Sequence, residues 1–297
     1  MRILQICNKA PYPANDGSSI AIYNMARGLY DNNAELHLLT INTKKHFKED
    51  SSVPQEFKTK THYRSVYKDT SPSALGAFFN LFSSKSYFIS RFYFKEFEDA
   101  LIETLKKNTF DIVQLEGLFM APYIEIIKKF SKAKIALRAH NIEHLIWQRH
   151  IANESSGLKR SYLKIQNSRL KTYEEEIFTK VDVIVTITDA DKNYIHKQFP
   201  KLNIVTCLTG VDLADYEQNT NVKKQENTIF SFGSMDWMPN LESVDWFLNN
   251  CWGKINAKHP SCKFIIAGRH MPQKFKTLQL PNVQIEENVT NNRDFYS

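Results

Sequence analysis

The sequence has few of the residues that mark several common classes of protein. Glycine is scarce, with 9 among 297 residues, so each loop glycine is a candidate for close approach of the backbone to a ligand. The four cysteines form no Cys-x-x-Cys pair, which indicates neither a zinc site nor a redox motif. No apolar stretch approaches the roughly 20 residues of a transmembrane helix, and no signal-peptide pattern opens the chain. These absences predict a cytoplasmic protein.

Positive charge is in excess but is not concentrated. The formal net charge is +7 and the isoelectric point about 9.0, yet no run of Lys and Arg exceeds two residues. An aromatic RNA-binding signature is also missing. We therefore expect the basic surface to meet an anionic small molecule or an anionic membrane rather than a nucleic acid.

Short runs rich in β-branched residues alternate with longer helical patterns along the chain. Several runs are apolar on both faces, as are strands covered by helices on both sides. This alternation predicts an α/β fold with doubly wound parallel sheets. The expected strands are residues 3–7, 36–41, 62–66, 112–116, 134–139, 183–188, 204–208, 228–232, 263–267 and 283–286.

A polar stretch divides the chain into two expected domains. Residues 212–227 have almost no apolar periodicity and are typical of a linker, which predicts domains at residues 1–222 and 223–297. The first would contain seven strands and the second three. Because three strands rarely form an independent parallel-sheet domain, we expect the second domain to be incomplete, with another helix beginning near Ser297.

The loop after the first strand contains Asp16, Gly17 and Ser18 and leads into a helix. A helix N-terminus offers unpaired N–H groups to an anion. Gly17 permits close approach, and Ser18 or Ser19 is expected to cap the helix. An ordinary Gly-containing turn explains the same residues. The loop is not Gly-x-Gly-x-x-Gly, so an NAD-linked enzyme is not supported.

A second polar cluster follows the fifth strand and contains Arg138, His140, Asn141 and Glu143. Ligands of open α/β sheets lie beyond the carboxyl ends of the strands. His140 is suited to orienting a hydroxyl or sharing its proton, although a histidine here can also serve only as a structural hydrogen-bonding group. His144 lies four residues after His140, but no His-Glu-x-x-His motif and no third ligand accompany the pair, so no metal site is predicted.

Two more strands end at glycines in the second domain. Gly233 and Ser234 follow one strand and precede a helix, and Gly268 ends the next strand. These positions fit a ligand held at the strand ends, and structural turns explain them equally well.

Residues 74–93 are rich in aromatic side chains, including Phe78, Phe79 and Phe82 near Lys85. Such an aromatic and basic segment can contact a membrane surface or a lipid-linked acceptor. The alternative is a stripe of core residues.

Taken in order, these clusters resemble glycosyltransferase family 4 of bacterial polysaccharide biosynthesis. The similarity covers nearly the whole chain. The matching elements are Pro-Tyr-Pro and Asp-Gly-Ser in the opening loop, Arg-Ala-His-Asn-Ile-Glu at 138–143, Leu-Thr-Gly-Val-Asp at 208–212, Phe-Gly-Ser-Met-Asp-Trp-Met-Pro-Asn at 232–240 and Phe-Ile-Ile-Ala-Gly at 264–268.

The resemblance implies a GT-B fold, with two Rossmann-like domains that bind the acceptor and the donor. It implies transfer of a sugar with retention from a UDP- or GDP-sugar, without a cofactor or bound metal, to a polysaccharide or lipid-linked acceptor, as in capsule or lipopolysaccharide synthesis. By this similarity His140 lies near the transferred sugar, Gly17 approaches donor phosphate or acceptor, and Gly233 and Ser234 begin the donor side.

The sequence departs from the family pattern in two places. Ser234-Met235-Asp236-Trp237 stands where many relatives have Arg and Lys for the diphosphate. The chain also ends before the family's glycine-rich loop and pair of glutamates, so we expect part of the donor site to be missing. The alternative function is therefore a non-catalytic acceptor-binding or scaffold protein, which no nucleotide sugar would stabilise.

Overall fold

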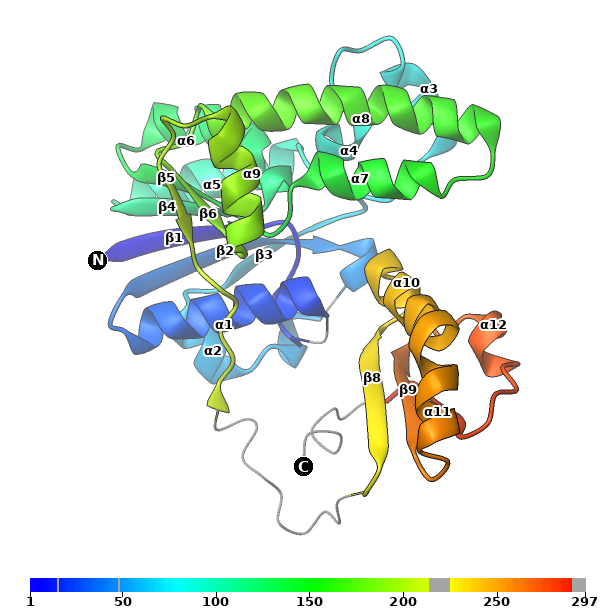
Figure 1. Ribbon diagram of the computed structural model, residues 1–297. Coiled ribbons are helices and arrows are strands. Elements are labelled where there is room, and N and C mark those ends of the chain that lie inside the picture. The colour runs from blue at the N-terminus through cyan, green and yellow to red at the C-terminus, as the bar shows by residue number, and fades with distance from the viewer. Residues whose placement is uncertain (15, 48, 214–224, 290–297) are drawn as a thin grey trace. The chain divides into compact units, whose positions relative to one another are not determined.

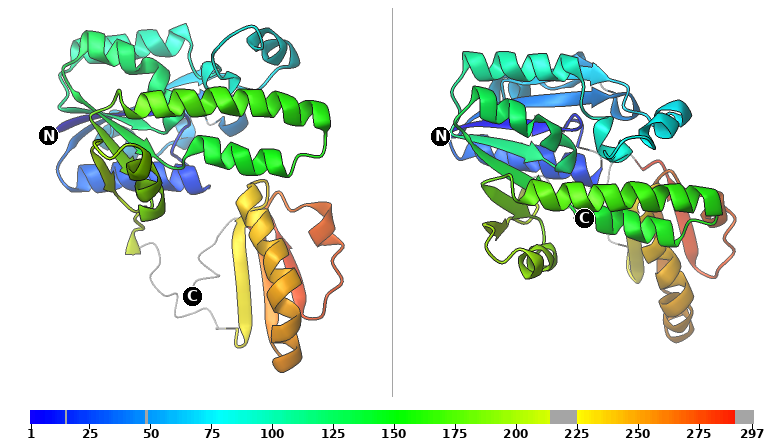
Figure 2. Two further views of the ribbon diagram at one scale, coloured as in Figure 1. Left: turned by 45° about the horizontal axis from the view of Figure 1, so that its top comes forward. Right: turned by 90° about the horizontal axis from the view of Figure 1, so that it is seen from above.

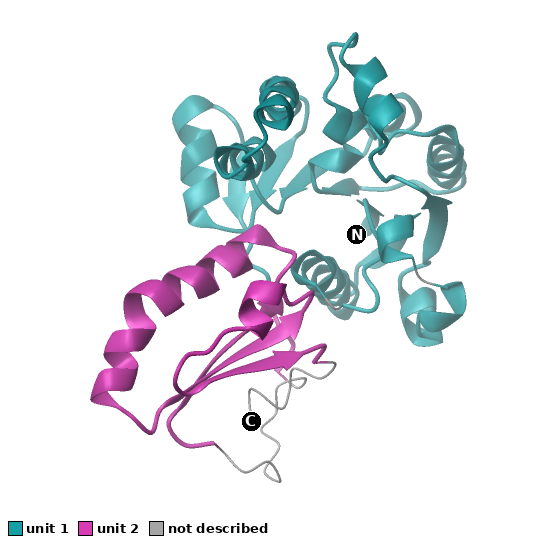
Figure 3. Cartoon of the chain, turned by 90° about the vertical axis from the view of Figure 1, so that its right-hand side faces the viewer, with its two compact units in different colours: residues 1–210 teal, residues 211–297 magenta. Residues whose placement is uncertain are grey.

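The computed structural model describes residues 1–14, 16–47, 49–213 and 225–289 (Figure 1). The chain divides into two compact units, Met1–Gly210 and Val211–Ser297, which are coloured separately in Figure 3. The predicted boundary at residue 222 and the helix expected near Ser297 lie outside the described residues, so both stay predictions.

The first unit is built on a parallel sheet of seven strands. Its order is β3-β2-β1-β4-β5-β6-β7, so the chain starts near the middle of the sheet and extends to each edge in turn. Every pairing is parallel, as the alternation of strands and helices predicts. The strands are β1 (Arg2–Cys7), β2 (Glu35–Thr43), β3 (Arg64–Lys68), β4 (Ile112–Glu116), β5 (Lys134–Ala139), β6 (Val183–Thr186) and β7 (Ile204–Thr206).

Helices cover both faces of this sheet (Figures 1 and 2). Alternate residues of β1 enter different cores: Ile3 packs with Ile22 and Phe57, whereas Leu4 packs with Phe97 and Leu101. The helices are α1 (Gly17–Asp31), α2 (Gln55–Lys60), α3 (Ala74–Asn80), α4 (Tyr87–Ser90), α5 (Lys95–Lys107), α6 (Ile124–Phe130), α7 (Glu143–Ala152), α8 (Gly157–Phe178) and α9 (Asp189–Gln198), with 3₁₀ turns at Lys44–His46, Asp50–Ser52 and Leu118–Tyr123.

The second unit contains a parallel sheet of three strands in the order β10-β9-β8. Its core includes Val244, Trp252, Phe264 and Phe275. All ten predicted strands are thus present, and the predicted α/β class is confirmed. The elements are β8 (Thr228–Ser234), α10 (Met238–Phe247), a π-helical turn (Leu248–Trp252), α11 (Gly253–Lys258), β9 (Lys263–Arg269), α12 (Gln273–Lys276) and β10 (Val283–Glu287).

The aromatic segment at residues 74–93 divides into an exposed part and a buried part. Around α3, Phe79 and Phe82 are 67% and 80% exposed, whereas Phe88 in α4 lies in the core. Asn80 attaches α3 to α8, because its side-chain oxygen accepts hydrogen bonds from Gln166 and Arg169. The segment is therefore part core and part exposed surface, and contact of the exposed part with a membrane stays a prediction. Within the described part of the chain, no helix is both long and apolar enough to cross a membrane.

Candidate functional site at the ends of the central strands

A buried polar network lies at the carboxyl ends of β1, β4 and β5. Glu116 is opposite Cys7 on one side and opposite Arg138 on the other, and Gln114 is opposite Gln5. Because side chains alternate along a strand and the register is aligned, these residues project from the same face of the sheet. That face is covered by α1, which begins directly after the loop that follows β1.

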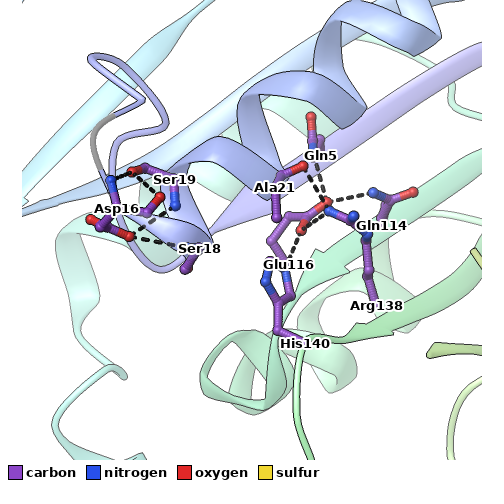
Figure 4. Close-up of polar contacts among 9 residues, drawn as sticks. All are labelled: Gln5, Asp16, Ser18, Ser19, Ala21, Gln114, Glu116, Arg138 and His140. Atoms are coloured by element: carbon purple, nitrogen blue, oxygen red, sulfur yellow. Dashed lines mark hydrogen bonds and ion pairs between the residues drawn. The ribbon is translucent and has the colours of Figure 1, made fainter. Parts of the chain in front are cut away.

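Glu116 is the centre of this network (Figure 4). One of its carboxylate oxygens accepts hydrogen bonds from the side-chain amides of Gln5, at 2.6 Å, and Gln114. The other oxygen accepts one from His140 Nε2 at 2.6 Å and lies 3.3 Å from a guanidinium nitrogen of Arg138. Four donors from three strand ends therefore converge on one buried carboxylate.

The environment of Glu116 keeps this carboxyl group ionised. Burial by itself would raise the pKa of Glu116, but the hydrogen bond from His140 and the charge of Arg138 outweigh burial and lower it to about 2. An ionised carboxylate only accepts hydrogen bonds, so His140 Nε2 carries a proton. In the neutral ring, Nδ1 of His140 is then a hydrogen-bond acceptor, and the hydrogen bond from Nε2 to Glu116 fixes the orientation of the ring.

Arg138, which the sequence placed among residues facing the ligand, is buried inside the unit. Its guanidinium group donates a hydrogen bond to the backbone oxygen of Ala21 in α1 at 2.9 Å and pairs with Glu116. The Nε atom of Arg138 is buried and has no hydrogen-bond partner among the described residues. The positive charge of Arg138 therefore compensates the negative charge of Glu116, and its hydrogen bond to Ala21 connects α1 to the sheet.

Asn141 and Glu143 belong to a second network at the start of α7. The carboxylate of Glu174 on α8 accepts hydrogen bonds from the backbone amides of Glu143 and His144 and from His144 Nδ1. Desolvation and the nearby charge of Glu174 raise the pKa of Glu143 to about 8, although a hydrogen bond with Asn141 opposes the change. The rings of His140 and His144 thus bind two different carboxylates and do not form a shared pair of metal ligands.

The loop before α1 has Asp16 as the N-cap of the helix, not Ser18 or Ser19 as predicted. The Asp16 carboxylate accepts hydrogen bonds from the amides of Ser18 and Ser19, and the Ser19 hydroxyl accepts one from the Asp16 amide. Lys9 also binds Asp16, and although burial would raise the pKa of Asp16, Lys9 lowers it. Since Asp16 already occupies two first-turn amides, an anion above the exposed Gly17 would have to displace its carboxylate.

In the second unit, the predicted residues also contact one another. Gly268 has a φ of +151°, and an added Cβ atom would lie 1.8 Å from the backbone oxygen of Gly233. A Cβ atom on Gly233 would meet the amide of Asn240, which donates a hydrogen bond to the Ser234 carbonyl. The Ser234 hydroxyl donates one to Asp236 at 2.7 Å. The two glycines are thus explained by close packing of β8 and β9.

Glu35, His37 and His62 form a cluster that the sequence did not indicate. Their potential ligand atoms lie within 4.8 Å of one another. However, the two imidazole rings are stacked with their centroids 4.3 Å apart and an interplanar angle of 16°, so their in-plane lone pairs lie in two nearly parallel, separated planes and do not converge on one point. Arg2 also pairs with Glu35 at 2.9 Å. We assign no ion to this cluster.

Glu116, Gln5 and Gln114 are the functional candidates that sequence reasoning missed. The available signal was the repeated placement of polar residues in otherwise apolar strands, since Gln5 interrupts β1 and Gln114 and Glu116 alternate with apolar residues in β4. Only the register shows that they meet on one face.

Comparison of the sequence with models of known families and with curated proteins gives no match. Solved structures do match. Sucrose-phosphate synthase from Thermosynechococcus elongatus is similar with a TM-score of 0.63 at 11% identity, over 99% of this chain and 72% of that chain.

HepE from Anabaena, solved with UDP-glucose, has a TM-score of 0.58 at 12% identity, over 99% of this chain and 71% of that chain. UGT71G1 from Medicago truncatula, also solved with UDP-glucose, has a TM-score of 0.52 at 13% identity, over 97% and 72%. These neighbours are GT-B glycosyltransferases, and at such low identity they show the fold alone. The fold of this chain is of the GT-B type.

Proposed function

We propose that this protein transfers a sugar from a nucleotide diphosphate donor to a saccharide or lipid-linked acceptor, with retention, as in family 4 glycosyltransferases. The observation that supports this proposal most strongly is the position of His140. It follows β5 at the carboxyl end of the sheet, where ligands of open α/β folds bind, and Glu116 fixes its ring.

The geometry of His140 suits a residue that binds a sugar hydroxyl. With Nε2 donating to the ionised Glu116, the neutral ring offers Nδ1 as an acceptor. Glu116 would also stabilise a positive charge on the imidazole if the ring takes up a proton near the reacting sugar. His140 is thus assigned the catalytic role, with Glu116 and Arg138 as positioning residues that do not touch the substrate.

We assign the acceptor to the first unit and the UDP- or GDP-sugar to the second. Gly233, Ser234 and Gly268 are the proposed contacts with the donor in the second unit. In the first unit, Gly17 and Ser18 are proposed contacts with a phosphate that would displace the Asp16 carboxylate from the Ser18 amide, and Asn141 follows His140 at the acceptor side. Backbone amides at the strand ends would stabilise the negative charge that develops on the departing diphosphate. No cofactor and no metal are proposed.

Membrane contact through α3 is proposed as the way a lipid-linked acceptor is reached. Leu75, Phe78, Phe79 and Phe82 are exposed on one short segment, Lys85 follows them, and the net charge of +7 favours an anionic surface. Replacing Phe79 and Phe82 by Ser should reduce sedimentation with phosphatidylglycerol vesicles about tenfold or more, because two phenyl groups lose their apolar environment. Replacing the exposed Leu213 by Ser is the control.

A panel of UDP- and GDP-sugars tests the proposed function. We expect at least one to bind the whole chain in saturation-transfer NMR, and the His140→Ala variant to alter the signals of the sugar protons while the exposed His196→Ala variant leaves them unchanged. Failure of every donor to bind, together with binding of saccharide acceptors, would instead support the non-catalytic acceptor-binding protein.

A further inference from the structure

A basic hollow lies between α7 and α8 of the first unit, apart from the network of Glu116. Its volume is about 560 Å³, and α9 contributes one side chain, Tyr194, to its lining. The two helices pack against each other. No residue of the proposed glycosyl-transfer site lines this hollow.

Three cationic side chains line the hollow from one face of α8. Arg160, Lys164 and Lys171 are separated by four and seven residues, which places them on the same side of a helix with 3.6 residues per turn. Among the described residues, no carboxylate belongs to the lining. Arg160 donates to the neutral backbone oxygen of Glu154, which does not compensate its charge, and Lys171 lies 3.7 Å from a carboxylate oxygen of Glu175 outside the lining. The hollow is therefore suited to an anion that accepts charge-assisted hydrogen bonds.

Other residues of the lining offer hydrogen-bond acceptors. The Oδ1 atom of Asn167 is buried and accepts no hydrogen bond from the described residues. Tyr194 is 3.0 Å from His144 Nε2, and His144 Nδ1 is 2.6 Å from Glu174. Since the Glu174 carboxylate accepts a hydrogen bond from Nδ1–H, Nε2 of the neutral ring accepts the hydrogen bond that the Tyr194 hydroxyl donates. The Tyr194 oxygen then keeps its lone pairs for a donor in the hollow.

The hollow combines cationic side chains with hydrogen-bond acceptors that are available to a donor, and these two features indicate the chemical class of its ligand. We propose that this site binds a sugar phosphate, whose phosphate contacts Arg160, Lys164 and Lys171 and whose hydroxyls donate to Asn167 and Tyr194. The phosphate can be free or can link a polyol to a lipid, since the recognised groups are the same. This inference does not depend on the proposed transfer reaction, because it uses other residues and no nucleotide.

Calorimetric titration of the whole chain with glucose 6-phosphate, inorganic phosphate and glucose tests the chemistry. We expect glucose 6-phosphate to bind with a dissociation constant below about 1 mM and more tightly than either fragment. The Lys164→Ala/Lys171→Ala variant should weaken this binding about tenfold or more, whereas Lys132→Ala, at an exposed lysine elsewhere in the unit, should not.

The Tyr194→Phe variant separates recognition of the hydroxyls from recognition of the phosphate. It should weaken glucose 6-phosphate severalfold and leave inorganic phosphate unchanged, because the phenyl ring still fills the same space. A circular-dichroism melt checks that the variants fold. Binding that is lost in His140→Ala but kept in Lys164→Ala/Lys171→Ala would overturn the assignment, even if the transfer reaction is later demonstrated.

A vesicle experiment identifies the source of the phosphate. If the ligand is lipid-linked, the chain should bind phosphatidylglycerol vesicles, whose headgroup has free hydroxyls, more tightly than phosphatidylserine vesicles of equal charge, and this preference should disappear in Tyr194→Phe. If the ligand is free, glucose 6-phosphate binds and the two vesicles bind equally. Absence of both the preference and glucose 6-phosphate binding refutes the proposal.

Discussion

Replacing Glu116 by Gln should destabilise the first unit strongly. The substitution removes the only carboxylate that the described structure shows beside the buried guanidinium of Arg138. Lowering the pKa of Glu116 from 4.5 to about 2 corresponds to about 3 kcal/mol of stability at 1.36 kcal/mol per pH unit. Removing one partner of a buried ion pair typically costs about 3–5 kcal/mol, and this range includes the value derived from the pKa of Glu116.

The pH dependence of this contribution follows from the sign of the change. Because the folded state lowers the pKa of Glu116, its contribution is complete above pH 4.5, the value for the unfolded chain, and is lost as the pH falls toward about 2. The wild-type chain should therefore lose stability over that window, and Glu116→Gln should lose less there because it has no carboxyl group to protonate.

Hydrogen exchange followed by mass spectrometry measures the effect within the first unit alone. The slowest amides of β4 and β5 should exchange about two powers of ten faster in Glu116→Gln at pH 7. Glu125→Gln is a matched control, because the Glu125 side chain is 73% exposed and should change stability by less than about 0.5 kcal/mol. A change of less than threefold in Glu116→Gln would refute the inference that Glu116 is ionised and supports the fold.

Substitutions at Gly268, Asp16 and Glu143 test three separate features by hydrogen exchange. Gly268→Ala should destabilise the second unit by more than about 2 kcal/mol, since the added Cβ would collide with the Gly233 backbone. A Cβ added at Gly253 meets nothing within 4 Å, so Gly253→Ala should stabilise the unit by about 0.5–1 kcal/mol. Equal exchange rates in the two variants would contradict the collision at Gly268. Asp16→Ala should cost α1 about 1 kcal/mol and Asp16→Asn much less, because Asn also caps helices; equal losses would exclude capping as the cause. Glu143→Gln should stabilise the first unit by about 1–3 kcal/mol at pH 8 but not at pH 4. The reason is that folding raises the pKa of Glu143 to about 8, so that above pH 4.5, the value for the unfolded chain, ionisation of Glu143 favours the unfolded state. A stability difference between the variant and the wild type that does not change with pH would contradict the raised pKa.

The sequence predicted the strands well because local patterns determine them. All ten were found, including β5 with its exact residues 134–139 and β4 with 112–116. Apolar β-branched runs covered on both sides leave little ambiguity. The ends were less certain: β2 extends to Thr43, because pairing with β3 continues past the apolar run.

The candidate site was predicted less completely because it depends on register and on competition between side chains. His140 was found from its place after a strand, but its partner Glu116 is 24 residues away in sequence. Similarly, a motif cannot show that the Asp16 carboxylate accepts the hydrogen bonds of the helix N-terminal amides that were predicted to bind an anion. Nor can it show that the Arg138 side chain lies inside the unit and donates to Ala21. The segment at residues 74–93 was ambiguous because Phe79 and Phe88 are chemically alike but only the latter is buried.

The most direct test of the central claim is a transfer assay with labelled UDP- and GDP-sugars and a bacterial lipid extract as acceptor. We expect label from at least one donor to enter the organic phase, and we expect His140→Ala to lower this rate by about 100-fold or more while His196→Ala does not. Transfer that proceeds equally well in His140→Ala, or no transfer from any donor, would contradict it.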